Sequence, residues 1–274
     1  MNVTITAADI NKLRQTTGAG MLDCRKALTE SNGDFEAAID WLRKQGQKVA
    51  AKRSDREAKE GVVIAQTTAD HKSGIVLCVS AETDFVSRNP EFVAFVQTIA
   101  DAAIANDVKT AEELKEAKVG NETVADMIND KLASIGEKIE LTRFERVEAP
   151  YVASYIHGAN RMGVLVSMTK EAADAGKDVA MQIAAMNPLA VDETSISQET
   201  KDREKAIAIE MIKAEGKPAE MAEKIADGKM NKFFKDNTLM HQAFVKDNSK
   251  SVADYLKSVD ADLKVTDFKR VALG

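Results

Sequence analysis

The fold is decided by residues 61–82, which read GVVIAQTTADHKSGIVLCVSAE. Two apolar, β-branched runs, 61–69 and 74–82, flank a polar turn, and this composition predicts a β-hairpin. A loop is expected at 83–89, after which Pro90 suits the first turn of a helix. Apolar residues at helical spacing then mark one buried face, namely Phe92, Val96, Ile99 and Ala103. The unit is strand, turn, strand, loop and helix.

The same unit recurs further along the chain. A second hairpin is predicted from YVASYIHG (151–158) and VLVSMTKE (164–171), and the latter aligns with IVLCVSAE (75–82) at a constant offset of 89 residues. A helix follows in both cases, although the second connecting loop is shorter and lacks an Asp-Phe pair. We therefore expect two related subdomains, each with a small antiparallel sheet.

The segments around these units complete the fold class. Residues 123–135 are typical of a helix ended by Gly136, and 139–148 of a third strand for the first sheet. The tail predicts a helix at 251–258 and a last strand at 263–271. Because strands and helices mix without a regular β-α-β alternation, the predicted class is α+β.

Three short helices are predicted at 6–46. Thr6 and Asp9 have the spacing of a capping box, which begins a helix whose buried face holds Ile10 and Leu13. Gly18 and Gly20 interrupt it. The second helix has Met21, Cys24 and Leu28 on one face and stops at Asn32-Gly33; the third is capped by Asp34, buries Phe35, Ile39 and Leu42, and ends at Gly46. Together they predict a small independent bundle.

Two further segments have distinct compositions. Residues 47–60 are charged nearly throughout and predict a solvated connector, partly helical. Residues 195–235 are rich in Lys and Glu, with Ile207 and Met211 before a Gly216-Lys217-Pro218 turn and Met221 and Ile225 after it. This apolar stripe is too narrow for a core, so an antiparallel helical hairpin that projects from the body is expected.

These patterns give five predicted units. They are a three-helix domain at 1–46, a charged linker at 47–60, a first core subdomain at 61–148, a second core subdomain at 149–189 and 236–274, and a helical hairpin inserted at 190–235.

Composition excludes several classes of protein. Over 274 residues the formal net charge is −6, whereas a nucleic-acid binder usually has a strongly basic domain. Cys24 and Cys78 lie far apart, without metal or redox spacing. No apolar run is long enough to span a bilayer, and no signal-peptide pattern follows Met1, so a cytoplasmic protein is expected.

No catalytic constellation is found. His71, His157 and His241 have no ligand-spaced neighbours, and Gly18-Ala19-Gly20 lacks the ending of a phosphate loop. We therefore expect no enzyme, no metal and no cofactor. The stretch 44–59 holds six cations and keeps an RNA-binding function open as an alternative, but acidic residues interrupt it and no aromatic residue offers stacking.

Thr83-Asp84-Phe85-Val86 is the unusual feature of the chain. A phenylalanine beside a carboxylate, in a loop just past a strand end, is poorly placed for a core. It either folds back onto its own helix or stands exposed as a binding wedge, because loops on rigid scaffolds carry function. The pattern alone leaves both readings open.

A resemblance covers nearly the whole chain. Bacterial elongation factor Ts is similar to it in five segments that follow the family order: LRQTTGAGMLDCRKAL (13–28), ETDFVSRNPEF (82–92), YIHGANRMGVLV (155–166), MQIAAMNP (181–188) and FVKDNSKSVADYL (244–256). The resemblance implies a ubiquitin-associated-like (UBA-like) N-terminal domain, a core of two related α+β subdomains, and a coiled-coil hairpin inserted in the second.

The resemblance also implies a function. Family members bind elongation factor Tu and accelerate GDP release without catalysing a reaction or binding nucleotide themselves. Thr83, Asp84, Phe85 and Val86 match the loop that intrudes beside the nucleotide site and dislodges Mg²⁺. Arg14 and Met21 match the part that docks on the GTPase domain, and His157 matches a contact of the second subdomain.

Other partners are constrained by the same argument. No membrane or nucleic-acid partner is expected, and a homodimer through the helical hairpin is a further possibility. One departure from the family pattern is the ending VALG (271–274), where many members continue into a helical tail.

Overall fold

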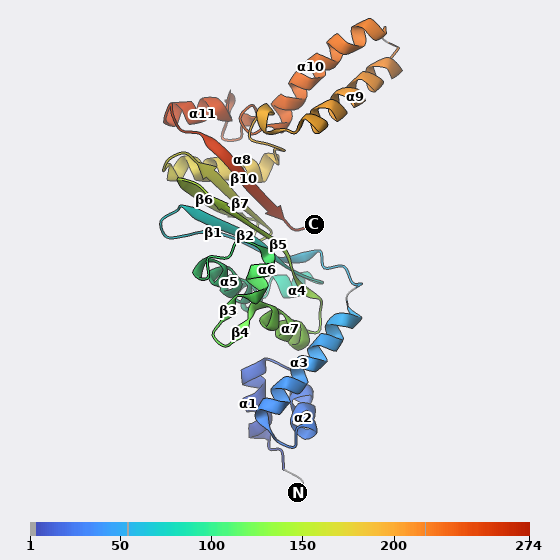
Figure 1. Ribbon diagram of the computed structural model, residues 1–274, viewed down its shortest axis with the longest axis vertical. Helices are drawn as coiled ribbons and strands as arrows, with labels where there is room; N and C mark the ends of the chain where they lie inside the picture. Colours follow the sequence, from blue (N-terminus) through green and yellow to red (C-terminus); the bar gives the residue numbers. More distant parts are fainter. Residues whose placement is uncertain (1–3, 54, 217) are drawn as a thin grey trace.

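Three helices form a bundle at one end of an elongated molecule, as seen in a computed structural model that describes residues 4–53, 55–216 and 218–274 (Figure 1). They are α1 (Ala7–Thr17), α2 (Met21–Glu30) and α3 (Phe35–Lys52). The Thr6–Asp9 capping box is present, and Leu13, Cys24 and Leu28 are buried as predicted. Met21, however, is 45% exposed, so the buried face of α2 is narrower than its sequence pattern indicates.

Helix α3 does not end at Gly46. It continues to Lys52 and crosses the boundary predicted between the bundle and the connector. Gly46 is buried where α3 crosses α7 (Val124–Ile135), and a Cβ added there would lie 2.8 Å from the Cβ of Ala133. The glycine therefore permits a close contact between two helices and does not act as a helix stop.

The first sheet contains the hairpin predicted within residues 61–82. Its order is β1 (Glu60–Thr67), β2 (Ser73–Ala81) and β5 (Ile139–Glu148), with both pairings antiparallel. Helix α5 (Pro90–Ala105) and helix α7 supply the buried apolar residues on one of its faces. The third strand at 139–148 and the helix ended by Gly136 are thus confirmed.

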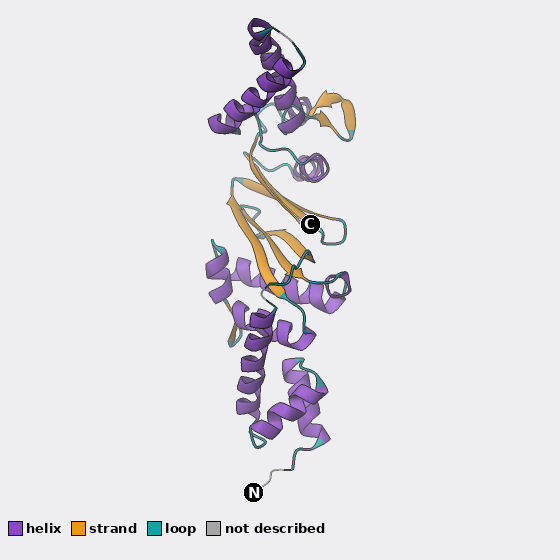
Figure 2. Ribbon diagram, turned by 90° about the vertical axis from the view of Figure 1, so that its right-hand side faces the viewer, coloured by secondary structure: helices purple, strands orange, loops and turns teal. Residues whose placement is uncertain are grey.

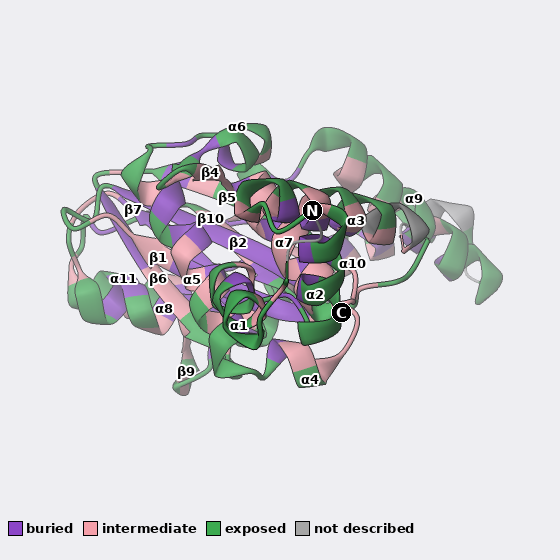
Figure 3. Ribbon diagram, turned by 90° about the horizontal axis from the view of Figure 1, so that it is seen from below, coloured by how far each residue is buried: buried purple, intermediate pink, exposed green. Residues whose placement is uncertain are grey.

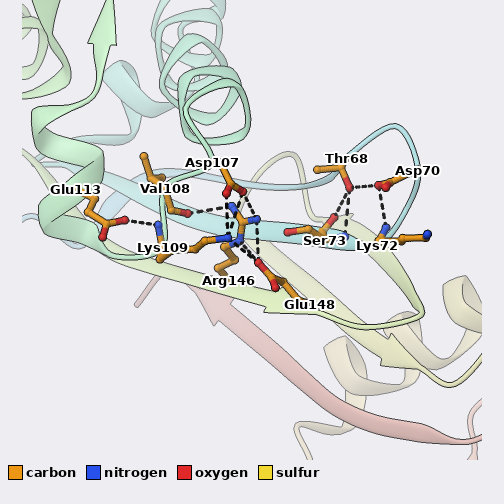
Figure 4. Close-up of polar contacts among 10 residues, drawn as sticks. All are labelled: Thr68, Asp70, Lys72, Ser73, Asp107, Val108, Lys109, Glu113, Arg146 and Glu148. Carbon is orange, nitrogen blue, oxygen red and sulfur yellow. Dashed lines mark hydrogen bonds and ion pairs between the residues drawn. The ribbon is translucent and has the colours of Figure 1, made fainter.

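Polar side chains fix the loops at the far end of this sheet (Figure 4). In the β1–β2 turn, Thr68 donates its hydroxyl to Asp70 over 2.7 Å. Arg146 of β5 donates to the carbonyl oxygen of Val108 over 3.0 Å and also binds Asp107 and Glu148. The connection after α5 is therefore held against β5.

The second sheet has the same strand order, β6 (Tyr151–His157), β7 (Met162–Met168) and β10 (Val265–Ala272), again antiparallel. Helix α8 (Ala173–Met186) and helix α11 (Val252–Val259) contribute to its core. Hairpin, helix and late third strand therefore occur twice. The mixture of helices with small antiparallel sheets confirms the α+β class.

The two sheets pack against each other, between helices on either side (Figure 2). Their shared core includes Val63 and Val76 from the first sheet and Leu165 from the second. Glycine allows the close approach: a Cβ at Gly163 would lie 2.9 Å from Val76, and a Cβ at Gly74 would lie 3.1 Å from Leu165.

Helices α9 (Gln198–Ala214) and α10 (Ala219–Asn237) extend away from the body at the end opposite the bundle (Figure 1). Their contact is made by Ala208, Ile212, Ala222 and Ala226, all buried. Ile209 and Ile225 pack against this cluster and are partly buried, whereas Ile207, Met211 and Met221 are exposed. Of the four apolar residues predicted to form the stripe, only Ile225 therefore lies at the contact.

The remaining elements are short. They are α4 (Asp84–Ser87), α6 (Ala111–Glu116), β3 (Lys118–Val119), β4 (Glu122–Thr123), the 3₁₀ turn η1 (Glu193–Ser195), β8 (Ala243–Phe244) and β9 (Asp247–Ser251). No helix within the described parts of the chain is both long and apolar enough to cross a membrane.

Candidate functional site

The segment after β2 is a single helical turn, not the loop that was predicted. Helix α4 spans Asp84–Ser87, and Thr83 and Asn89 flank it in extended conformation. The amide of Arg88 donates to the carbonyl oxygen of Asp84 over 3.0 Å. Asn89 then caps α5 by accepting the amide of Glu91 over 2.9 Å. The Ser87 hydroxyl also donates to the carbonyl oxygen of Asp84 over 3.3 Å, so polar groups within the segment close this compact turn.

The turn buries one side and exposes the other. Val86 packs against the core of the first sheet, and Ser87 is buried. Phe85 is 87% exposed, whereas Phe92, one helix later, is 2% exposed. Seen along the long axis, α4 lies at the rim of the molecule (Figure 3). Phe85 therefore does not fold back onto its own helix and is exposed in the free protein.

Asp84 lies beside Phe85 on the same turn. Its carboxylate forms an ion pair with Arg88 at 3.3 Å, and both side chains are substantially open to solvent. An exposed pair of this kind contributes at most about 1 kcal/mol. The carboxylate can therefore exchange Arg88 for another partner at low cost.

Two carboxylates hold the base of the turn. Glu137, just past Gly136, accepts the amide of Thr83 over 3.1 Å and its hydroxyl over 2.8 Å. Glu82 accepts the amide of Lys138 over 2.6 Å and forms ion pairs with Arg53 and Arg56. The backbone donor at Lys138, followed by Arg53, holds the pKa of Glu82 below its usual range.

His157 ends β6 and is exposed, with its Nδ1 3.0 Å from the hydroxyl of Tyr155. The turn that follows it reaches back to the first sheet, since Arg161 forms an ion pair with Glu60 at 2.9 Å. Glu60 in turn is paired in register with Ala81, which precedes the Thr83 turn. His157 and Phe85 therefore lie at the same end of the two packed sheets, on different elements.

Arg14 and Met21 belong to the bundle and are both exposed. The structure places them on α1 and α2, whereas Phe85 is on α4 and His157 on β6. The candidate residues thus form three exposed positions, on the bundle, on α4 and at the end of β6.

Sequence comparison decides the family. The family model described as "Elongation factor TS" matches residues 82–274, which begin at Glu82, immediately before the Thr83 turn. Elongation factor Ts from Christiangramia forsetii is 50% identical over 98% of this chain and 99% of its own length.

The chain belongs to the elongation factor Ts family. The Flavobacterium psychrophilum relative is also 50% identical, over 99% of both chains, and that from Xanthobacter autotrophicus is 48% identical over 98% of this chain and 92% of its own. These full-length matches include the bundle and the β1–β2 hairpin, which lie outside the family-model match.

Leu22, an exposed apolar residue of this elongation factor Ts family member, was not among the site residues predicted from the sequence. Leu22 is 80% exposed beside Met21. Cys24 and Leu28 fix the buried face of α2, and consecutive helical residues point in directions about 100° apart, so Met21 and Leu22 cannot both share that face. The helical spacing in the sequence therefore already indicated that Leu22 lies off the buried face of α2.

Three of the six cations in the basic stretch 44–59 form ion pairs within the chain. Arg53 and Arg56 bind Glu82, and Lys59 forms an ion pair with Glu57 at 2.7 Å. Lys44 and Lys48 are exposed. Among the residues that the structure describes, no group of three or more His, Cys, Asp or Glu side chains is arranged to hold a metal ion.

Proposed function

We propose that this chain is a guanine-nucleotide exchange factor for elongation factor Tu in translation elongation, and not an enzyme. The observation that carries the proposal is Phe85, an almost fully exposed phenylalanine on an anchored turn of a chain whose relatives are elongation factors Ts. A large apolar side chain held in water costs free energy in the free protein, and burial against a partner recovers it.

The proposed mechanism uses the Thr83–Val86 turn as a wedge. Phe85 enters between elements of the partner beside the nucleotide, while Asp84 disturbs the polar network around the bound Mg²⁺. Because Mg²⁺ bridges phosphate oxygens, its displacement leaves their charge poorly neutralised and weakens GDP binding. Asp84 already has a cationic neighbour in Arg88, so the proposal does not make it a stable metal ligand.

Docking is assigned to the other exposed positions. Arg14 and Met21 would contact the GTPase domain, and Leu22 extends that apolar surface. His157 would contact another domain of elongation factor Tu. The proposed architecture is that of the family: a UBA-like bundle, two related subdomains, and the α9–α10 hairpin inserted in the second.

Exchange also imposes a thermodynamic condition. The factor must bind the nucleotide-free partner more tightly than the GDP form, because only differential affinity shifts an equilibrium. The coupling is reciprocal, so nucleotide that rebinds must weaken the grip of the factor.

The test is release of fluorescent GDP from purified elongation factor Tu. The parent chain should accelerate release, and Phe85→Ala should lower the rate by at least about tenfold, as expected for an interface hot spot. The side chain is exposed, so the variant should keep the parental free energy of unfolding in urea.

A matched control is Leu189→Ala, which removes an exposed apolar side chain from the segment that follows α8. It should release GDP as the parent does. A parent chain that leaves the release rate unchanged overturns the proposed function; equal rates for the parent and Phe85→Ala overturn the wedge alone.

A further inference from the structure

The base of the Thr83–Val86 turn continues the ladder of hydrogen bonds between β2 and β5. Strands β2 and β5 pair as far as Ala81 and Ile139. One position further, the amide of Lys138 donates to the side chain of Glu82, and one beyond that, the amide of Thr83 donates to the side chain of Glu137. Carboxylate oxygens therefore replace the backbone carbonyls of the ladder, in both directions.

These two contacts, Glu82 with the Lys138 amide and Glu137 with the Thr83 amide, form a clamp. The clamp restrains a helix that is too short to be stable by itself. Helix α4 has four residues, and the first turn of any helix fixes several dihedral angles for a single hydrogen bond. The Thr83 side chain does not cap it, and the Thr83 hydroxyl donates to Glu137 instead. Order at Phe85 thus depends on Val86 and Ser87 beneath it and on the clamp at its N-terminal end.

The clamp also joins the turn to the end of α3. Arg53 approaches Glu82 to 2.7 Å and Arg56 approaches it to 3.4 Å, while the Glu82 side chain is only 12% exposed. A carboxylate this enclosed is kept ionised by several donors acting together. The segment that leaves the bundle and the segment that carries Phe85 therefore meet at one side chain.

We propose that Glu82 and Glu137 are positioning residues for nucleotide exchange: they hold the Thr83–Val86 turn in its binding geometry before elongation factor Tu arrives. The proposal rests on the exchange function above and concerns residues that touch neither nucleotide nor metal. A turn ordered in advance loses less conformational entropy on insertion, so clamped protein passes the insertion step faster than unclamped protein.

The docking positions on α1, α2 and β6 lie on other elements, so loss of the clamp should leave initial binding unchanged. We therefore expect Glu137→Ala to lower the maximal rate of GDP release about tenfold, the scale of a lost charged hydrogen bond, with little change in the half-saturating concentration. Glu137→Gln retains one acceptor oxygen for the Thr83 amide and should recover part of the rate. A variant that is merely part-unfolded would show the opposite split, a raised half-saturating concentration at the parental maximal rate.

A second measurement does not depend on the partner. Amide hydrogen exchange of the free protein should become faster at residues 83–89 in Glu137→Ala and stay unchanged in α5. The matched control is Glu145→Ala, which removes an exposed carboxylate from the same strand β5 and should match the parent in both assays.

The outcomes separate the two proposals. A parental maximal rate in Glu137→Ala, with an active parent, overturns the positioning role and leaves the exchange function standing. If the parent does not accelerate GDP release from elongation factor Tu, the exchange function and the effect of the clamp on its rate fail together. Unchanged hydrogen exchange at 83–89 overturns the clamp as the source of order in the turn.

Discussion

At the scale of single residues, the candidate site is determined by the contacts that each side chain of the Thr83–Val86 turn makes. Phe85 and Val86 are adjacent and both apolar, yet one is exposed and the other packs on the core of the first sheet. Sequence located the Thr83–Val86 segment but left the exposure of Phe85 open. The supporting residue Glu137 lies 54 positions away, and no local pattern links it to Thr83.

Glu82 gives the clamp a pH dependence. Its folded-state pKa lies below the ordinary value, mainly because the Lys138 amide donates to its carboxylate. Ionised Glu82 therefore stabilises the fold at pH above the unfolded value of about 4.3, and this contribution is lost as the pH falls through the folded-state value. We predict that Glu82→Gln is less stable than the parent at pH 7 and that this difference shrinks towards pH 3.

The measurement is urea unfolding of both chains at several pH values. Glu140→Gln is the control, because this exposed carboxylate on β5 lies near Lys138 without holding its amide. A difference between the parent and Glu82→Gln that is independent of pH would show that charge on Glu82 contributes nothing.

At the scale of elements, most helices and strands followed from periodicity, caps and turn residues. The capping box at Thr6 begins a helix as expected, and Gly136 ends another in the left-handed region. Gly46 was predicted to end a helix in the same way, but α3 continues past it to Lys52. A glycine within a helical pattern indicates either a stop or a close contact, and only the position of α7 distinguishes the two cases.

Gly46 also yields an element-scale prediction. Replacing a helical glycine by alanine normally stabilises a helix by up to about 1 kcal/mol. At Gly46 the new Cβ would lie 2.8 Å from the Cβ of Ala133 and 3.3 Å from the carbonyl oxygen of Asn129, so we expect Gly46→Ala to destabilise the α3–α7 contact by about 1–3 kcal/mol.

Thermal and urea unfolding measure the effect, and two further variants make it specific. Gly228→Ala in α10 meets nothing within 4 Å and should be neutral or stabilising. Ala133→Gly combined with Gly46→Ala should show a favourable coupling energy in a double-mutant cycle. Stabilisation by Gly46→Ala alone would mean that α3 and α7 are not in tight contact.

At the scale of the whole molecule, sequence indicated the repeated hairpin unit but not how the two copies meet. Gly74 and Gly163 are 89 residues apart, the offset of the repeat, and both lie where the sheets touch. Their role was not evident because a strand glycine can equally mark a bulge or a turn. The consequence is one core between the sheets, formed by residues of both.

That shared core predicts how the molecule unfolds. Leu165 is fully buried between the sheets, whereas Leu13 is fully buried in the separate core of the bundle. Each change to alanine should cost about 2–5 kcal/mol locally. Cooperative units follow contiguous cores. Leu165→Ala should therefore speed amide hydrogen exchange in both sheets together. Leu13→Ala should speed it in α1 and α2 while leaving the sheets at the parental rate.

Native-state hydrogen exchange read by mass spectrometry in low denaturant measures both effects, with the parent as reference. Faster exchange confined to the second sheet in Leu165→Ala would show that the two sheets open independently, and faster exchange throughout the molecule in Leu13→Ala would make the bundle part of one cooperative unit with them.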